Sequence, residues 1–242
     1  MNRIFLLTMV IFIACRGKHN HEHSKNENDM KEHKHSQANH ENHKNHEHGS
    51  ANKHMHQSSL DELVARFESP ERDEYQQPEK VLAYLGDIKD KTIMDIGAGT
   101  GYFSVKLADH GAHVIAADVD DDFQDYLKKR IEDNHLTGIE TRKIPYDSPG
   151  LSNQEVDMVF MVNTYHHIEN RVEYFNKVRQ GIKNDGSLVI IDFYNIELPV
   201  GPPVGHKVDM GVVVNELKDA GFETLDLDVN LLPYQFVIRA RK

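Results

Sequence analysis

The fold is decided by residues 92–103, which read TIMDIGAGTGYF. The first part, Thr92–Ile96, is mostly apolar and predicts a short buried strand. The next part, Gly97–Gly101, holds three glycines, whose backbone freedom lets a tight loop approach a ligand closely. A helix is expected to begin at Tyr102, and its N-terminus would offer free N–H groups to the same ligand. This stretch therefore predicts a strand, a binding loop and a helix, the opening unit of an α/β domain.

The spacing of the glycines separates two kinds of ligand. The loop has the pattern G-x-G-x-G, whereas dinucleotide-binding proteins carry G-x-G-x-x-G and would need a glycine where Tyr102 stands. An acid, Asp95, also lies at the end of the strand just before the loop. Its charge would repel a pyrophosphate and attract an ammonium group, such as that of S-adenosylmethionine (SAM). The pattern therefore favours SAM over a dinucleotide.

A second acid follows the second predicted strand, His113–Ala117. Asp118 comes seventeen residues after Gly101, at the carboxyl end of the strand. A carboxylate there can accept hydrogen bonds from both hydroxyls of a cofactor ribose. The alternative is that Asp118 caps the helix that follows it. Asp120 or Asp121 can cap that helix instead, which would leave Asp118 for the ribose.

Strands and helices alternate from residue 92 to the end of the chain. Their short apolar runs suit strands buried on both faces of a parallel sheet, with a turn at residues 183–186. Strands with crossover helices predict a doubly wound α/β domain. The expected strands are Thr92–Ile96, His113–Ala117, Ile139–Ile144, Val156–Val162, Leu188–Phe193, Glu223–Asn230 and Gln235–Arg241. The expected helices are Tyr102–His110, Phe123–Asn134, Arg171–Ile182 and Val208–Ala220.

A helical extension, residues 58–90, is expected before this domain. Ser59 and Glu62 form a capping box at the start of its first helix, which Pro70 should stop. A second helix begins at the next proline. The segment between the two helices, residues 75–77, could fold over a bound cofactor.

Four segments resemble the class I SAM-dependent methyltransferases. Residues 94–101 resemble the first motif of that superfamily, residues 113–118 its second motif, and residues 156–163 its fourth strand. The continuation through residues 164–193 is similar to the branch called type 11. The resemblance implies a Rossmann-like sheet of seven strands with a reversed final strand, formed by residues 91–242.

The resemblance also implies a reaction and a set of cofactor contacts. The domain would transfer a methyl group from SAM to an acceptor, which we expect to be a small molecule. The glycine loop would hold the methionine end, an acid after the second strand the ribose, and a residue after the fourth strand the region beside the methyl group. The adenine contact would follow the third strand, where Asp147 is the candidate. The implied cofactor-binding residues are Asp95, Gly97, Ala98, Gly99, Gly101, Asp118, Val119 and Asn163.

Candidate catalytic residues lie after strands four and five. Methyl transfer from a sulfonium is an in-line displacement, so positioning matters most, and a base is needed only when the nucleophile must lose a proton. The candidates are Tyr165, His166 and His206, with Asp192 as a supporting acid. Tyr165 and His166 could equally form walls of the cofactor pocket, and His206 could cap a helix. The proline- and glycine-rich residues 198–206 predict a stiff loop over the substrate pocket.

The first fifteen residues predict the signal of a bacterial lipoprotein. Arg3 provides a positive start, and the apolar run Ile4–Ala14 is too short to span a bilayer. The run ends at Cys15, the only cysteine of the chain, in a context that resembles a lipobox. We expect a lipid on Cys15 to hold the protein at the periplasmic side of the cell envelope. A cytoplasmic location is the alternative.

Residues 16–57 predict a disordered, histidine-rich linker. They hold eleven of the 17 histidines and almost no apolar residues, so they cannot form a packed core. Neutral imidazoles at HxH and HxxH spacing are suitable ligands for zinc, copper or nickel, although a purely polar spacer is the alternative. The candidate metal ligands are His19, His21, His23, His33, His35, His46, His48, His54 and His56.

The charge of the chain argues against one class of partner. The formal net charge is −11, and residues 1–59 hold eight Lys and Arg against six Asp and Glu, so residues 60–242 carry −13. A domain this acidic is a poor nucleic-acid binder. Two functions remain: a SAM-dependent methyltransferase, which we expect, and a metal-binding envelope lipoprotein with a non-catalytic domain. The sequence leaves the acceptor and the oligomeric state open.

Overall fold

The computed structural model describes residues 58–242. The predicted signal and lipid site at residues 1–15, and the histidine-rich residues 16–57 with their metal ligands, lie outside the described residues. Ser59 and Glu62 form the predicted capping box, with each side chain bound to the backbone of the other residue. The helical extension therefore begins where the sequence predicts.

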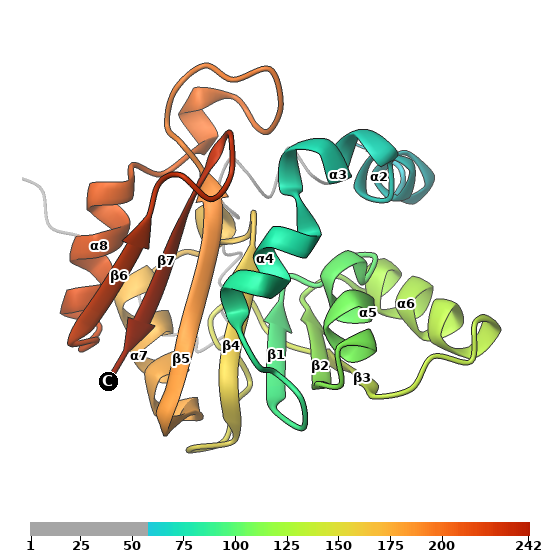
Figure 1. The fold of residues 1–242 in the computed structure, drawn as a ribbon, viewed down its shortest axis with the longest axis horizontal. Coiled ribbons are helices and arrows are strands. Elements are labelled where there is room, and N and C mark those ends of the chain that lie inside the picture. The colour runs from blue at the N-terminus through green and yellow to red at the C-terminus, as the bar shows by residue number, and fades with distance from the viewer. Residues whose placement is uncertain (1–57) are drawn as a thin grey trace, which may run out of the picture. The chain divides into compact units, whose positions relative to one another are not determined.

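A sheet of seven strands forms the centre of the molecule, in the order β3-β2-β1-β4-β5-β7-β6 (Figure 1). Strands β1 to β5 are parallel, and β7 runs antiparallel to β5 and to β6. The predicted Rossmann-like sheet with a reversed final strand is thus confirmed. The strands are β1 (Thr92–Ile96), β2 (His113–Asp118), β3 (Ile139–Lys143), β4 (Val156–Val162), β5 (Ile182–Phe193), β6 (Thr224–Asp228) and β7 (Gln235–Arg241).

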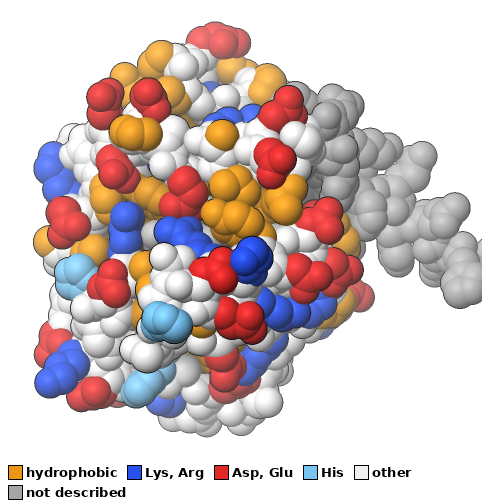
Figure 2. All heavy atoms as spheres, turned by 90° about the vertical axis from the view of Figure 1, so that its right-hand side faces the viewer, with side chains coloured by type: hydrophobic (Ala, Val, Ile, Leu, Met, Phe, Trp, Pro, Cys, Tyr) orange, Lys and Arg blue, Asp and Glu red, His pale blue; other side chains and the backbone are white. Residues whose placement is uncertain are grey.

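Helices cover both faces of the sheet. The α-helices are α2 (Leu60–Phe67), α3 (Pro70–Gln76), α4 (Pro78–Leu85), α5 (Tyr102–Asp109), α6 (Asp121–Asp133), α7 (Arg171–Gly181) and α8 (Met210–Asp219). Two short 3-10 helices are η1 (Tyr165–His167) and η2 (Val204–His206). Of the helices in residues 58–242, none is long and apolar enough to cross a membrane. Figure 2 looks onto the side that carries α5 and α6 and shows acidic and basic side chains interspersed there.

The alternating side chains of β1 divide the core into two layers. Ile93 packs with residues of α4 and α5, whereas its neighbour Met94 packs with residues of α7 and α8. Both side chains are fully buried. A strand covered on both faces is apolar on both faces, which explains why β1 lacks the polar alternation of a surface strand.

One helix and one strand boundary differ from the prediction. Helix α2 ends at Phe67, before Pro70 as predicted, but Pro70 also takes the first position of a further helix, α3, where its fixed φ fits and its missing N–H costs nothing. Strand β5 begins at Ile182, so the predicted turn at residues 183–186 is part of the strand and faces a register shift in β4. At Gly186 a Cβ atom would lie 2.4 Å from the backbone oxygen of Asp157, so the absent side chain allows this close approach.

Candidate functional site

The glycine loop joins β1 to α5 and depends on glycine at two points. Gly97 and Gly101 have φ angles of 77° and 84°, in the left-handed region that glycine favours. A Cβ atom on Gly97 would lie 2.3 Å from Thr164 Oγ1, and one on Gly101 would lie 2.4 Å from a methyl carbon of Leu127. Conformation and the close packing of Thr164 and Leu127 therefore both require glycine at these two positions.

Asp118 lies at the carboxyl end of β2 and contacts the glycine loop directly. Its Oδ2 accepts a hydrogen bond of 2.8 Å from the N–H of Gly99, and its Oδ1 accepts one of 3.0 Å from Asp120. Asp120, in turn, caps α6 by accepting from the N–H of Asp122 and of Phe123. The capping alternative for Asp118 therefore does not apply, and its carboxylate stays at the loop. Burial raises the pKa of Asp118, while its backbone hydrogen bonds act against that shift.

Asp95 is buried beneath the loop. Its Oδ2 accepts a 2.7 Å hydrogen bond from the hydroxyl of Ser104 in α5. Burial raises the pKa of Asp95 to about 6, and the charge of Asp118 acts in the same direction, while Ser104 and Arg72 oppose the shift. The ionised carboxylate of Asp95 is therefore unfavourable in the ligand-free fold, and its loss would stabilise that fold. The charge is useful only for binding a cation at the loop.

Replacing Asp95 by asparagine is expected to stabilise the ligand-free protein by about 1–3 kcal/mol near pH 7.5. The pKa of Asp95 is about 6 in the folded state against an ordinary 3.8. The folded state therefore holds more protons than the unfolded state between these values, and stability falls as the pH rises through that window. Asparagine cannot ionise, so the gain should be small near pH 4 and level off above pH 6. Urea unfolding across this pH range measures it, and a pH-independent gain would contradict the account.

Helices α2 and α3 form an arm, residues 60–76, that lies against the glycine loop. The ring of Phe67 stacks on Phe123 of α6 with 5.9 Å between centroids. Glu68 accepts a 2.5 Å hydrogen bond from the hydroxyl of Thr100 and forms a 2.6 Å ion pair with Arg130. The arm therefore packs on the loop and on α6 through apolar and charged contacts.

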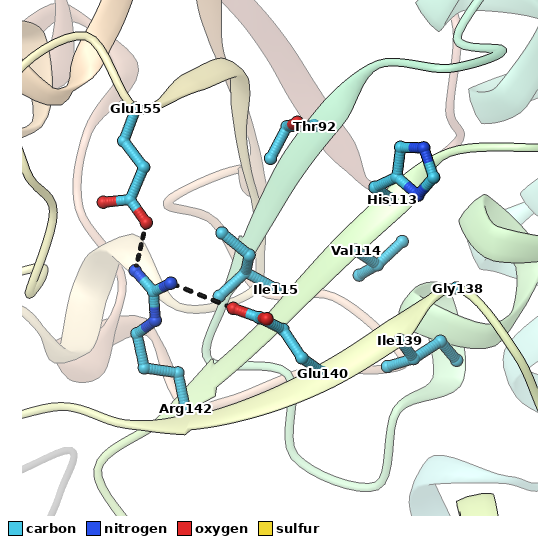
Figure 3. A pocket seen from close by; sticks show the side chains of 9 residues that line it. All are labelled: Thr92, His113, Val114, Ile115, Gly138, Ile139, Glu140, Arg142 and Glu155. Atoms are coloured by element: carbon cyan, nitrogen blue, oxygen red, sulfur yellow. Dashed lines mark hydrogen bonds and ion pairs between the residues drawn. The ribbon is translucent and has the colours of Figure 1, made fainter.

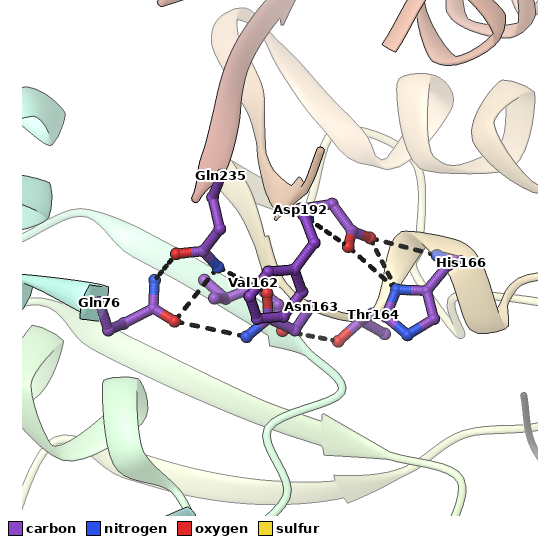
Figure 4. Close-up of polar contacts among 8 residues, drawn as sticks. Gln76, Val162, Asn163, Thr164, His166, Asp192 and Gln235 are labelled. Carbon is purple, nitrogen blue, oxygen red and sulfur yellow. Dashed lines mark hydrogen bonds and ion pairs between the residues drawn. The ribbon is translucent and has the colours of Figure 1, made fainter. Parts of the chain in front are cut away.

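The end of the arm meets the carboxyl end of β4 and the amino end of β7 through three amide side chains (Figure 4). Gln76 and Gln235 exchange hydrogen bonds of 3.2 and 3.3 Å between their amides. Gln235 also donates a 2.6 Å hydrogen bond to Asn163 Oδ1. Gln76 is fully buried. Residues 75–77 thus fold over the strand ends, beside Asn163, the predicted neighbour of the methyl donor.

His166, in η1, and Asp192, next to the last residue of β5, form a buried pair (Figure 4). His166 Nδ1 lies 3.0 Å from both carboxylate oxygens of Asp192, and each side chain is only 4% exposed. The backbone N–H of Phe193 donates a 2.8 Å hydrogen bond to Asp192 Oδ1 and fixes the carboxylate. With a carboxylate as acceptor, Nδ1 donates and Nε2 keeps its lone pair. The pair can therefore present Nε2 of His166 as a proton acceptor.

His167 lies beside this pair. The rings of His166 and His167 are 4.3 Å apart between centroids. Burial lowers the pKa of His167 to about 3, and the charges of His166 and His206 lower it further, while Asp192 acts in the opposite direction. His167 is therefore neutral at physiological pH. His206, in η2, is close enough for its charge to act on His167.

The chain is similar to known methyltransferases in sequence and in fold. Residues 94–190 match the family model described as a methyltransferase domain. The chain is also similar to the crystal structure of a SAM-dependent methyltransferase from Aquifex aeolicus, with 26% identity and a TM-score of 0.70, over 76% of this chain and 98% of that one. A second match is a SAM-dependent methyltransferase from Mesorhizobium loti, with 18% identity and a TM-score of 0.57, over 68% and 96% of the two chains. The sheet thus has the fold of SAM-dependent methyltransferases.

Tyr165, another predicted catalytic residue, has its hydroxyl bound between two helices. It is fully buried, and its hydroxyl donates a 2.6 Å hydrogen bond to Glu216 of α8. Glu216 also receives two hydrogen bonds from Arg171, and the Tyr165 ring stacks on Phe175. These contacts give Tyr165 a packing role between α7 and α8, and they lend no support to catalysis by its hydroxyl.

Two surface hollows lie away from the glycine loop. One, of about 500 Å³, lies at the amino-terminal ends of the strands, where Thr92 and His113 line it and Arg142 pairs with Glu140 and Glu155 (Figure 3). The other lies beside α7 and α8. Within residues 58–242, no group of three or more His, Cys, Asp or Glu side chains is arranged to hold a metal ion. The glycine loop, at the opposite ends of the strands, remains the candidate site.

Two residues near the loop were not predicted from the sequence. Arg72 of the arm lies over Tyr102, the residue that follows the loop. Tyr146 lies close enough to Asp118 for their charges to interact, whereas the predicted adenine contact, Asp147, is exposed. No local pattern marks Arg72, but an aromatic residue after the third strand is a signal that could have indicated Tyr146 as a stacking surface.

Proposed function

We propose that the domain transfers a methyl group from SAM to a small-molecule acceptor. The observation that carries the proposal is the glycine loop between β1 and α5, with Asp95 beneath it and Asp118 bound to Gly99. An acid near the loop suits the ammonium group of the cofactor, and an acid at the end of β2 suits its ribose. Thr164 and Leu127 pack directly against Gly97 and Gly101, so the backbone of the loop is held in a defined path.

His166 is proposed as the base when the acceptor must lose a proton. The bound cofactor supplies an electrophilic methyl group on a sulfonium. His166 Nε2 takes the proton of the acceptor's hydroxyl, amine or thiol group as the acceptor atom attacks. Asp192 holds the imidazole through Nδ1 and stabilises the positive charge that then develops. His167 stays neutral because of its lowered pKa and adds no competing charge.

The loop of residues 198–206 supports a small acceptor. Lys207, which follows it, donates a 2.8 Å hydrogen bond to the backbone oxygen of Ile196 and so ties the two ends of the loop together. On the other side, the ring of Tyr75 in the arm lies 6.1 Å from the ring of Phe193 at the end of β5. Because the loop at Gly201 and the arm at Tyr75 both lie against Phe193, they cover the end of β5, which favours a small acceptor over a polymer.

Labelled methyl transfer tests this function. The purified full-length chain is incubated with SAM that carries an isotope in its methyl group and with pools of small hydroxyl, amine and thiol compounds. We expect one pool to acquire the label while S-adenosylhomocysteine forms in equal amount. SAM binding without label transfer to any acceptor, including fractionated cell extract, would favour a non-catalytic domain.

We further propose that a lipid on Cys15 anchors the protein in the cell envelope. The support is the apolar run that ends at this cysteine. Cell fractionation with a mass measurement of the N-terminal peptide tests it, and Cys15→Ser is expected to release the protein from membranes. A soluble, unmodified wild-type protein would place the domain with cytosolic SAM instead. Metal binding by residues 16–57 is a separate proposal, tested by zinc titration before and after deletion of that segment.

A further inference from the structure

Arg72 of α3 lies at the end of the glycine loop. Its guanidinium carbon is 3.9 Å from the centroid of the Tyr102 ring and 5.7 Å from that of Phe67. Its Nη1 donates a 3.0 Å hydrogen bond to the backbone oxygen of Phe67. Because Tyr102 follows Gly101 directly, the guanidinium lies beside the loop, held between two aromatic rings.

The guanidinium of Arg72 has no carboxylate partner in the part of the chain that the structure describes. Three other arginines in partly buried positions do form ion pairs: Arg130 with Glu68, Arg171 with Glu216, and Arg142 with Glu155. Arg72 is itself largely buried, and burial lowers its pKa. A cation removed from water without a counter-charge is costly, and the aromatic rings offset only part of that cost. The position therefore favours an anion from outside the chain.

Asp95 and Arg72 place a negative and a positive charge near the loop, which suits the ammonium and carboxylate groups of an amino acid. Asp95 lies beneath the loop, and Arg72 lies beside it, close enough for its charge to lower the pKa of Asp95. The two are not joined in an ion pair, so each can bind the opposite charge of a ligand. A guanidinium binds a carboxylate through two parallel hydrogen bonds, which an ammonium group cannot do.

We propose that Arg72 binds the carboxylate of the methionine end of SAM, so that the arm supplies part of the cofactor site. The inference rests on the proposed function and assigns that site a residue from outside the sheet domain. The ion pair of Glu68 with Arg130, which fastens the arm to α6, then positions Arg72. A nucleoside that lacks the carboxylate would still meet Asp118 but would gain nothing from Arg72.

Two ligands distinguish the contribution of the carboxylate to binding from that of the rest of the cofactor. Binding of SAM and of 5′-methylthioadenosine, which lacks the amino-acid group, is measured by calorimetry with the full-length chain. Arg72→Met should weaken SAM binding about tenfold to a hundredfold, the usual range for a charged hydrogen-bonded contact. Binding of 5′-methylthioadenosine should stay within about twofold. Arg66→Met is the matched control, because Arg66 is an exposed arginine of α2 near the same Phe67 ring.

Each other outcome contradicts the inference. An equal loss for both ligands would mean that Arg72 only holds the arm in place, and an unchanged SAM affinity would mean that Arg72 does not touch the cofactor. If Arg72→Met lowers the melting temperature strongly, Arg72→Lys is the variant that tests the inference. Lysine keeps the positive charge but lacks the planar guanidinium, so it should weaken SAM binding less than methionine does and leave 5′-methylthioadenosine binding unchanged. A wild-type chain that binds 5′-methylthioadenosine but not SAM overturns the inference, and one that binds neither overturns the proposed function itself.

Discussion

Replacing His166 by alanine is expected to lower the rate of methyl transfer by about 10²- to 10⁴-fold, the usual contribution of a positioned general base. His166 is held by Asp192 through Nδ1 at 3.0 Å, which leaves Nε2 to accept the proton. The loss should fall on kcat, because the cofactor contacts at the glycine loop are unchanged. The measurement is S-adenosylhomocysteine formation with the acceptor found by labelled transfer.

The control for this experiment is His135→Ala, because His135 is an exposed histidine after α6 and should leave the rate unchanged. Asp192→Asn should give an intermediate loss, since the amide can still contact His166 but cannot stabilise its positive charge. A His166→Ala variant with wild-type kcat would show that the acceptor is attacked without a base, and that the His166–Asp192 pair serves packing.

Gly101→Ala is expected to destabilise the protein by roughly 2–4 kcal/mol, because strain and overpacking act together. The backbone at Gly101 has a φ of 84°, which an alanine adopts only with strain. Its Cβ atom would also lie 2.4 Å from a methyl carbon of Leu127, which is fully buried in α6. Relief of that contact requires the buried side chain of Leu127, or α6 with it, to shift. Chemical denaturation of the full-length chain measures the loss.

Gly205→Ala is the matched control for the glycine experiment. Gly205 lies in η2 with no atom within 4 Å of the new Cβ position and no left-handed φ. Its replacement should change the free energy of unfolding by less than about 0.5 kcal/mol. Equal stabilities of the two variants would mean that the glycine loop accommodates a side chain at position 101 without strain, which would contradict this prediction.

The sheet was predictable because its strands have a local signal. Apolar runs buried on both faces and the glycines between β1 and α5 follow from the sequence alone. The start of β5 was not predictable, since Ile182 to Gly186 are strand residues only through pairing beside a register shift in β4. Pro70 follows the end of α2 as predicted, but the helix that begins at it was missed, because proline both stops and starts helices.

The site was predictable where its residues are near in sequence. Asp120 caps α6, one of the two caps that the sequence suggested, since a carboxylate just before a helix caps it. The amide contact of Gln76 with Gln235 joins residues 159 positions apart, and no local pattern announces it. Tyr165 was proposed for catalysis from its place after β4, but the direction of its side chain toward Glu216 is set by the packing of α8.

Calorimetric titration of the full-length chain with SAM tests the central claim most directly. We expect saturable binding of one SAM per chain, and Asp118→Ala should weaken it by about 1–3 kcal/mol, the cost of losing hydrogen bonds to a charged group. Asp125→Ala, on the exposed surface of α6, should bind SAM as the wild type does. No binding of SAM by the wild type, or equal binding by the Asp118→Ala variant, would contradict the account of the glycine loop.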